Sequence, residues 1–188
     1  MILGLDISTS CTGWSVLSSV GSLIDIGYIR LAKAGTIYQK AETVRDTLEK
    51  IKKDYNIERI YIEQNLQAFR SGFSSAKTID KLARFNGIIS YISYDIFNID
   101  PRFLNVNRAR KSLGIKIIRK KDGGSPTKEQ ILEWVTVEIS RESFLWPKKV
   151  LKSGPRKGAE VLLAECYDMA DAYVIARAGQ ISENASHE

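Results

Sequence analysis

The chain has 188 residues, 44% of them hydrophobic, which is enough for one ordinary globular domain with a sizeable core and argues against disorder. A net charge of +6 and a pI near 9.3 are compatible with a polyanionic partner. The only histidine is His187, and the two cysteines, Cys11 and Cys166, lie far apart. Zinc sites, histidine-assisted nucleophiles and a disulfide framework therefore lack the residues that they need.

The N-terminal half predicts three strands in a meander, followed by a helix and a fourth strand. Residues 1–6, 13–18 and 23–31 are the three strands, because apolar runs alternate there with short turns. Residues 38–55 carry apolar side chains at helical spacing, and residues 57–63 form the fourth strand. A connection through a helix allows this fourth strand to pair in parallel with an earlier one.

The C-terminal half predicts mainly helices. The longest covers residues 74–96, and its apolar stripe is wide enough for part of it to bury against a second chain. The segments that follow are a short strand at 103–106, a short helix or turn at 107–113, a basic loop at 114–125, a helix at 126–139, a basic connection at 141–158 and a last helix at 159–178.

This order of elements describes an α/β fold and resembles the ribonuclease H-like architecture. The predicted fold is a mixed five-stranded sheet, with an antiparallel meander plus parallel strands, flanked by helices. We predict one domain over residues 1–180 and a polar C-terminal tail over residues 181–188.

Four acidic residues are the candidate site. Asp6 and Glu63 end apolar strands, and Asp168 and Asp171 lie three residues apart on the last predicted helix, where both can project from one face. Each acid alone is more often a turn former, a salt-bridge partner or a solvated helix residue. Together they repel one another, and a cation makes such a cluster tolerable. Because the ligands are oxygen atoms, we expect Mg²⁺, with Mn²⁺ able to substitute and two ions per site.

Several motifs resemble the RuvC-like Holliday-junction resolvases of the ribonuclease H-like nuclease superfamily. The last helix has that family's Asp-x-x-Asp-Ala pattern, and the fourth strand ends in its Glu-Gln pair. Two further segments are similar to the family's lysine-bearing DNA contacts. The matching segments, in the family's order, are 2–16, 61–64, 108–114, 127–130 and 167–176.

The resemblance implies a crossover junction endodeoxyribonuclease that acts as a homodimer on four-way or branched DNA. The four acids are then metal ligands and catalytic residues, and Lys111 or Lys128 stabilises the transition-state phosphate. Small divergent resolvases of this kind are common in bacteriophages. We therefore expect a cytoplasmic location in a bacterial or phage-infected cell, with an organelle left open, and no association with a membrane.

A basic stretch and an aromatic loop are the predicted DNA contacts. Next to a phosphodiesterase site, the basic residues are expected to contact the phosphates of the DNA backbone. Elsewhere such a run of charges is usually a solvated face. Phe69 can stack at an opened base step or pack on the long helix, and Leu66 stands where the family often has an aromatic. A second basic segment, 148–157, either binds a flanking arm of the DNA or is only a soluble loop. The predicted DNA-binding residues are Phe69, Arg70, Arg108, Arg110, Lys111, Lys116, Arg119, Lys120, Lys121 and Lys128.

Three other functions stay open. A ribonuclease H acting on RNA–DNA hybrids would use the same acids, although the long helix and the basic loop favour branched DNA. A non-catalytic scaffold for branched DNA is disfavoured by the four intact acids. An actin-like ATPase or sugar kinase shares the fold, but it needs a duplicated domain for which 188 residues are too few.

Overall fold

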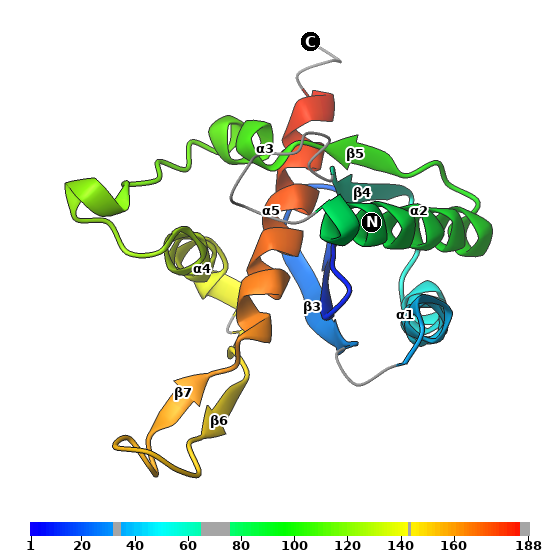
Figure 1. Cartoon of the computed structure of the whole chain (residues 1–188). Helices are drawn as coiled ribbons and strands as arrows, with labels where there is room; N and C mark the ends of the chain where they lie inside the picture. Colours follow the sequence, from blue (N-terminus) through cyan, green and yellow to red (C-terminus); the bar gives the residue numbers. More distant parts are fainter. Residues whose placement is uncertain (32–34, 65–75, 143, 185–188) are drawn as a thin grey trace.

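A five-stranded sheet lies at the centre of the computed structural model, which describes residues 1–31, 35–64, 76–142 and 144–184 (Figure 1). The strands run in the order β3-β2-β1-β4-β5. The first three form an antiparallel meander, while β4 pairs in parallel with β1 and β5 pairs in parallel with β4. The fourth strand therefore pairs in parallel with an earlier strand, as predicted. Their bounds are Ile2–Ile7, Cys11–Leu17, Leu23–Arg30, Arg59–Glu63 and Arg102–Leu104 for β1 to β5.

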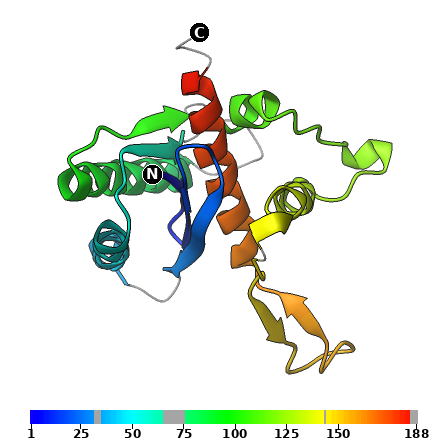
Figure 2. The same ribbon diagram turned by 180° about the vertical axis from the view of Figure 1, so that it is seen from behind.

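Helices cover both faces of this sheet (Figures 1 and 2). On one face lie α1 (Ile37–Asp54) and α2 (Ala76–Phe97). On the other face α5 (Glu165–Asn184) crosses the strands, with α3 (Val106–Ser112) and α4 (Thr127–Glu138) packed beside it. No helix within the described residues is both long and apolar enough to span a bilayer. Short 3-10 turns occupy Lys120–Asp122 and Ser140–Glu142.

The residues of β1 alternate between the two helical layers. Leu3 and Leu5 are buried with the residues of α1 and α2, whereas Ile2 belongs to the core beneath α5. Because successive side chains of a strand point to opposite faces, Gly4 and Asp6 share the α5 face with Ile2. The alternation in this strand therefore directs the Asp6 carboxylate towards the last helix.

Two glycines allow α5 to lie directly on the strands. A Cβ at Gly4 would be 2.4 Å from the Ala172 carbonyl oxygen, and one at Gly13 would be 2.0 Å from the Asp168 carbonyl oxygen. Ser15 adds a buried hydrogen bond, donating through its hydroxyl to the Ala172 carbonyl oxygen at 3.1 Å. These contacts set how close the first turns of α5 come to the carboxyl end of β1.

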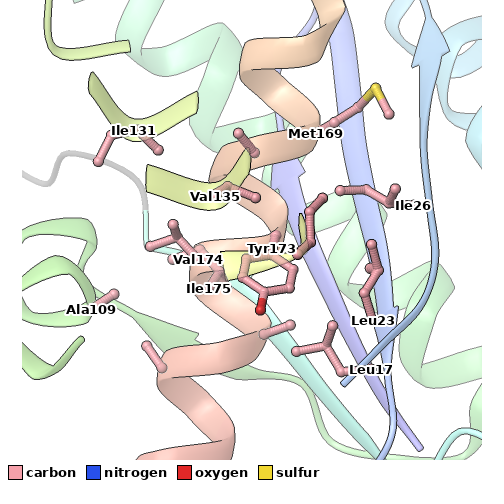
Figure 3. Packing of buried hydrophobic residues seen from close by; sticks show 14 of the residues in the cluster. Leu17, Leu23, Ile26, Ala109, Ile131, Val135, Met169, Tyr173, Val174 and Ile175 are labelled. Atoms are coloured by element: carbon pink, nitrogen blue, oxygen red, sulfur yellow. The ribbon is translucent and has the colours of Figure 1, made fainter. Parts of the chain in front are cut away.

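Apolar burial holds α5 in this position (Figure 3). Tyr173 and Val174 of α5 pack with Val135 of α4 and with Leu17 and Ile26 of the meander strands. None of these side chains is more than 5% exposed. The middle of α5 is therefore a core helix, and Asp168 and Asp171 lie in its first two turns.

Two predictions about the C-terminal third are wrong. The connection predicted at 141–158 contains β6 (Lys148–Val150), which pairs antiparallel with β7 (Glu160–Leu162) in a separate two-stranded sheet. The last helix consequently begins at Glu165 instead of residue 159, and it continues to Asn184, into the segment predicted as tail. The hairpin escaped the sequence pattern because it covers no core: all three residues of β6 are exposed, so no apolar alternation marks the strand.

Candidate active site

Strand pairing brings Asp6 and Glu63 together. Leu5 of β1 lies opposite Ile62 of β4, so Asp6 and Glu63 are the next residues along two adjacent parallel strands. Ile62 is buried with α1 and α2, whereas Tyr61 packs beneath α5. Because strand residues alternate, Glu63 leaves β4 on the same face as Tyr61. Both carboxylates therefore point to the side of the sheet that α5 covers.

Asp168 and Asp171 reach the same place from the first two turns of α5. All four acids line one pocket of about 440 Å³, named here the acidic pocket. The side chain of Asp171 is 8% exposed and that of Asp168 is 19% exposed. The fold therefore gathers the four predicted acids in one place. The other residues that line the acidic pocket are Ile7, Ser8, Ser10, Leu82, Arg110 and Lys128.

The acids in this pocket oppose one another's ionisation. Burial, followed by the charges of Glu63, Asp171 and Asp168, raises the pKa of Asp6 well above its ordinary value. Burial and the charge of Asp171 also raise the pKa of Glu63, against the effect of its hydrogen bond with Asp6. Burial raises the pKa of Asp171, although Arg110 opposes the shift. Such a cluster carries repulsion that a bound cation relieves.

Two basic side chains compensate part of this charge. Arg110 Nη2, on α3, lies 3.1 Å from Asp171 Oδ1, and both side chains are largely buried. Lys128 Nζ, in the first turn of α4, lies 3.6 Å from Asp168 Oδ1, and its side chain is 60% exposed. Burial works against the charge of Lys128, but Asp168, Asp171 and Asp6 raise its pKa on balance, so the ammonium stays charged at neutral pH. Arg110, predicted as a DNA contact, is thus also the partner of a candidate catalytic acid.

A second pocket of about 490 Å³ adjoins the acidic pocket and shares Arg110 with it. Lys111 and Lys116 provide its charge, and none of the described residues that line it is acidic. Cationic and hydrogen-bonding side chains of this kind suit a phosphate group. The lining residues of this basic pocket are Asn107, Arg110, Lys111, Gly114, Ile115, Lys116, Ile117 and Thr127.

Four further predicted DNA contacts are not among the described residues that line either pocket. Arg108 is exposed on α3. Arg119, Lys120 and Lys121 are exposed on the segment between α3 and α4, residues 113–126, which extends away from the sheet in both views (Figures 1 and 2). Phe69 and Arg70 lie outside the described residues, as does Leu66.

Two residues that position the site, Gly13 and Asn86, are not among those that the sequence predicts. Gly13 lies opposite Asp6 in the β1–β2 register and directly beneath the Asp168 backbone, so the absence of a side chain there lets the start of α5 approach β1 and β2. Asn86 of α2 donates through Nδ2 to the Glu63 carbonyl oxygen at 3.4 Å. A glycine inside a strand pattern signals the close approach of another backbone, and that signal was available for Gly13.

The chemistry of the acidic pocket suits a hard divalent cation. Its donors are oxygen atoms, from four carboxylates and from the hydroxyls of Ser8 and Ser10, and this set fits Mg²⁺ or Mn²⁺ better than zinc. No three Asp, Glu, Cys or His side chains in the described part of the chain are arranged as a ready-made metal site. Asp168 and Asp171 instead contact basic side chains. The donor types therefore fit a divalent ion. In this structure Asp171 is paired with Arg110 and Asp168 with Lys128.

The sheet order and the helical layers define a ribonuclease H-like fold. More particularly, the fold is that of RuvC: Thermus thermophilus RuvC in complex with a Holliday junction substrate matches with a TM-score of 0.64 at 12% identity, over 98% of this chain and 96% of that one. Another T. thermophilus RuvC structure gives 0.61 at 14% identity over the same shares. The yeast mitochondrial Holliday junction resolvase Ydc2 gives 0.55 at 13% identity, over 99% of this chain and 82% of that one. The predicted fold class is confirmed.

No family model matches the chain, and no curated protein matches its sequence. The resemblance that the sequence motifs indicated is thus supported at the level of the fold.

Proposed function

We propose that the chain is a divalent-metal-dependent endonuclease that resolves four-way or other branched DNA by paired hydrolysis of phosphodiester bonds. The observation that carries this proposal is the meeting of four carboxylates, from β1, β4 and α5, in one pocket whose rim carries a charged lysine. The RuvC fold adds support, because one solved structure with that fold holds a Holliday junction substrate. Hydrolysis of a phosphodiester requires compensation of negative charge at the phosphate, and acids that hold divalent ions are a common way to provide it.

Asp6, Glu63, Asp168 and Asp171 are the residues that would hold Mg²⁺ or Mn²⁺, and we expect two ions. Bound ions of this kind stabilise charge on the phosphate and lower the pKa of a water molecule. Asp6 interacts electrostatically with all three other acids, which makes it the central member of the set. Its raised pKa means that the free protein retains a proton at Asp6 and Glu63 more readily than ordinary carboxyls do, so loading of metal releases protons.

Lys128 is the proposed contact to the reacting phosphate. Its side chain is more exposed than the acids that it faces, so its ammonium can approach a substrate at the rim of the acidic pocket. Because its pKa is raised, Lys128 acts through its fixed positive charge and does not donate a proton at neutral pH.

Arg110 and Lys111 are the proposed contacts to the phosphates that flank the reacting one. The buried Nε of Arg110 has no hydrogen-bond partner within the described residues, and a phosphate oxygen would satisfy it. Arg110 lines both pockets, and Lys111 lines the basic one. A DNA strand that runs from the acidic pocket into the basic pocket would therefore meet successive cations.

Paired cleavage of a symmetric junction requires two active sites, so we propose a homodimer with two-fold symmetry. The outer surface of α2 is the proposed contact. Tyr91 and Tyr94 are 63% and 43% exposed there, while Phe85 and Ile89 face the sheet. Exposed aromatic side chains on a long helix are typical of a surface that another chain covers.

The test incubates the purified protein with labelled four-way, Y-shaped, linear and RNA–DNA hybrid substrates, each with Mg²⁺ or with EDTA. Paired nicks in the four-way substrate, dependent on Mg²⁺, are the expected result. Cleavage of the hybrid alone would replace the proposal with a ribonuclease H. Tight binding of the junction without cleavage in either Mg²⁺ or Mn²⁺ would replace it with a scaffold.

A further inference from the structure

A hairpin next to the start of α5 has no part in the chemistry proposed above. This hairpin, residues 147–163, contains β6 and β7 and extends away from the sheet and the helices in both views (Figures 1 and 2). Its pairing continues beyond the two strands, because Leu151 N donates to the Ala159 carbonyl oxygen at 3.0 Å and Gly158 N donates to the Leu151 carbonyl oxygen at 2.8 Å. The hairpin is therefore hydrogen-bonded almost to its tip.

The base of the hairpin is fixed to the body of the protein. Leu163 N donates to the Pro147 carbonyl oxygen at 3.0 Å, which closes the hairpin where it meets α5. Trp146 Nε1 donates to Thr136 Oγ1 of α4 at 2.8 Å, and Phe144 packs edge-on against Trp146 with ring centroids 5.2 Å apart. Contacts to both α4 and α5 therefore give the projecting hairpin a defined direction.

Positive charge concentrates at the tip of the hairpin. At the paired end, Lys148 binds Glu160 at 2.8 Å. At the tip, Lys152, Arg156 and Lys157 are exposed and form no ion pair with any residue that the structure describes. No acidic residue occurs from residue 148 to residue 159. The tip therefore carries like charges whose mutual repulsion a polyanion would relieve.

We infer that the hairpin tip binds the phosphate backbone of one arm of the DNA substrate, away from the bond that is cut. The inference rests on the proposed function. The tip, residues 152–158, contains no aromatic side chain for stacking on bases and no large apolar side chain for insertion into a lipid surface. Exposed lysine and arginine side chains with no acid among them suit phosphates, without selection of a base sequence.

The length of the hairpin sets where this contact falls. From Leu163 to Pro155 the chain covers eight residues. At roughly 3.3 Å per strand residue, the tip lies about 25 Å from the start of α5, whose first turns carry Asp168. Because B-DNA advances about 3.4 Å per base pair, an arm that runs along the hairpin would meet the tip about seven base pairs from the start of α5.

The first experiment compares two matched double variants of the full-length protein. Lys152→Ala with Lys157→Ala removes two charges from the tip. Lys50→Ala with Lys53→Ala removes two exposed charges from α1, on the opposite face of the sheet. Binding of a four-way junction is measured in EDTA at several salt concentrations.

Loss of two phosphate contacts at the tip reduces the slope of log affinity against log salt by about 1.8 and weakens binding by about tenfold near physiological salt. The α1 variant keeps the wild-type slope. Equal slopes for the tip variant and the wild-type protein would overturn the inference, and so would equal losses in the two variants.

The second experiment shortens the arms of the junction. With arms of about fifteen base pairs the tip variant binds more weakly than wild type, whereas with arms of about five base pairs the two proteins bind equally, because the tip then meets no DNA. A deficit that is independent of arm length would overturn the inference. Cleavage by the wild-type protein in Mg²⁺ is measured in parallel: its absence rejects the proposed function, while cleavage with no effect of the tip rejects only the role of the hairpin.

Discussion

The acidic pocket and the projecting basic segments are constructed in opposite ways. The acids lie on β1, β4 and α5, where strand register and two glycine contacts determine their positions. The cations of the β6–β7 tip and of residues 113–126 are exposed on segments that project from the body of the protein (Figures 1 and 2). The packing of the core therefore positions the acids, whereas the cations of the basic segments lie away from the core.

This difference follows from what each region is proposed to do. Cleavage depends on oxygen atoms held within a fraction of an ångström, so its residues belong on rigid elements. Binding to a DNA backbone depends mainly on how many cations come within reach of phosphates. Repulsion among the buried carboxylates of the acidic pocket lowers the stability of the protein. The cations of the basic segments are solvated and do not have this effect. Four predictions test this contrast, from the largest expected effect to the smallest.

Removal of a charge from the centre of the acidic pocket should have the largest effect. We expect Asp6→Asn and Asp171→Asn each to lower the rate of junction cleavage in Mg²⁺ at least about a thousandfold, roughly 4 kcal/mol, because each change removes a proposed metal ligand. Affinity for the junction in EDTA should stay close to that of the wild type. Asp46→Asn, on the exposed surface of α1, is the matched control and should cut normally. Retained cleavage in both pocket variants would mean that these acids do not form the site.

A side chain beneath α5 should disturb both the fold and the site. We expect Gly13→Ala to destabilise the protein by about 3 kcal/mol in urea unfolding, because the new Cβ would collide with the Asp168 carbonyl group. Asp46→Ala on α1 is the control: its side chain is exposed, so the change should stabilise the helix slightly. Equal stability of the two variants would show that α5 does not rest on Gly13 as described.

A lysine at the acidic pocket and a lysine on a basic segment should affect different properties, the first catalysis and the second binding. Lys128→Ala should lower kcat roughly 10- to 100-fold with little change in the salt dependence of binding, because its charge acts on the reacting phosphate. Lys120→Ala, in the exposed 3-10 turn, should leave kcat unchanged and reduce the salt slope by about 0.9. Single-turnover cleavage and filter binding separate the two. A change in kcat from Lys120→Ala would contradict the proposed division between the regions.

The smallest effect concerns the pH dependence of stability. Because the pKa of Asp6 is raised in the folded protein, its ionisation opposes folding: the cost is absent below the unfolded-state pKa near 4 and grows as the pH rises through the folded-state value. We therefore expect Asp6→Asn to stabilise the protein in EDTA by roughly 0.5–2 kcal/mol at pH 8, and not at pH 4. Urea unfolding at both pH values measures this difference. An advantage of the same size at both would exclude charge as the cause.

Much of the site could be predicted because its signals are local. Asp6 and Glu63 end apolar strands, and the alternation within each strand identifies the face on which the acid lies. The spacing of Asp168 and Asp171 assigns both to one side of a helix. The helical connection before the fourth strand allows that strand to pair in parallel with an earlier one. These features depend on short-range periodicity, which remains visible in one sequence.

The hairpin and the partners of the acids could not be predicted in this way. β6 and β7 bury no core, so they have no apolar alternation, and the last helix was extended over residues that belong to β7. The pairing of Arg110 with Asp171 joins residues 61 positions apart. It depends on how α3 packs against α5, and nothing in the residues around Arg110 distinguishes it from its basic neighbours.

The sequence by itself determined the order of the strands of the central sheet and of its helices, together with the identity of the four acids, because hydrophobic periodicity and residue type are properties of short segments. Only the tertiary structure decided how near those acids lie, which cations face them and where the basic hairpin points. Each of these depends on contacts between distant segments, such as Gly13 beneath Asp168, and their geometry is set by the packing of the whole chain.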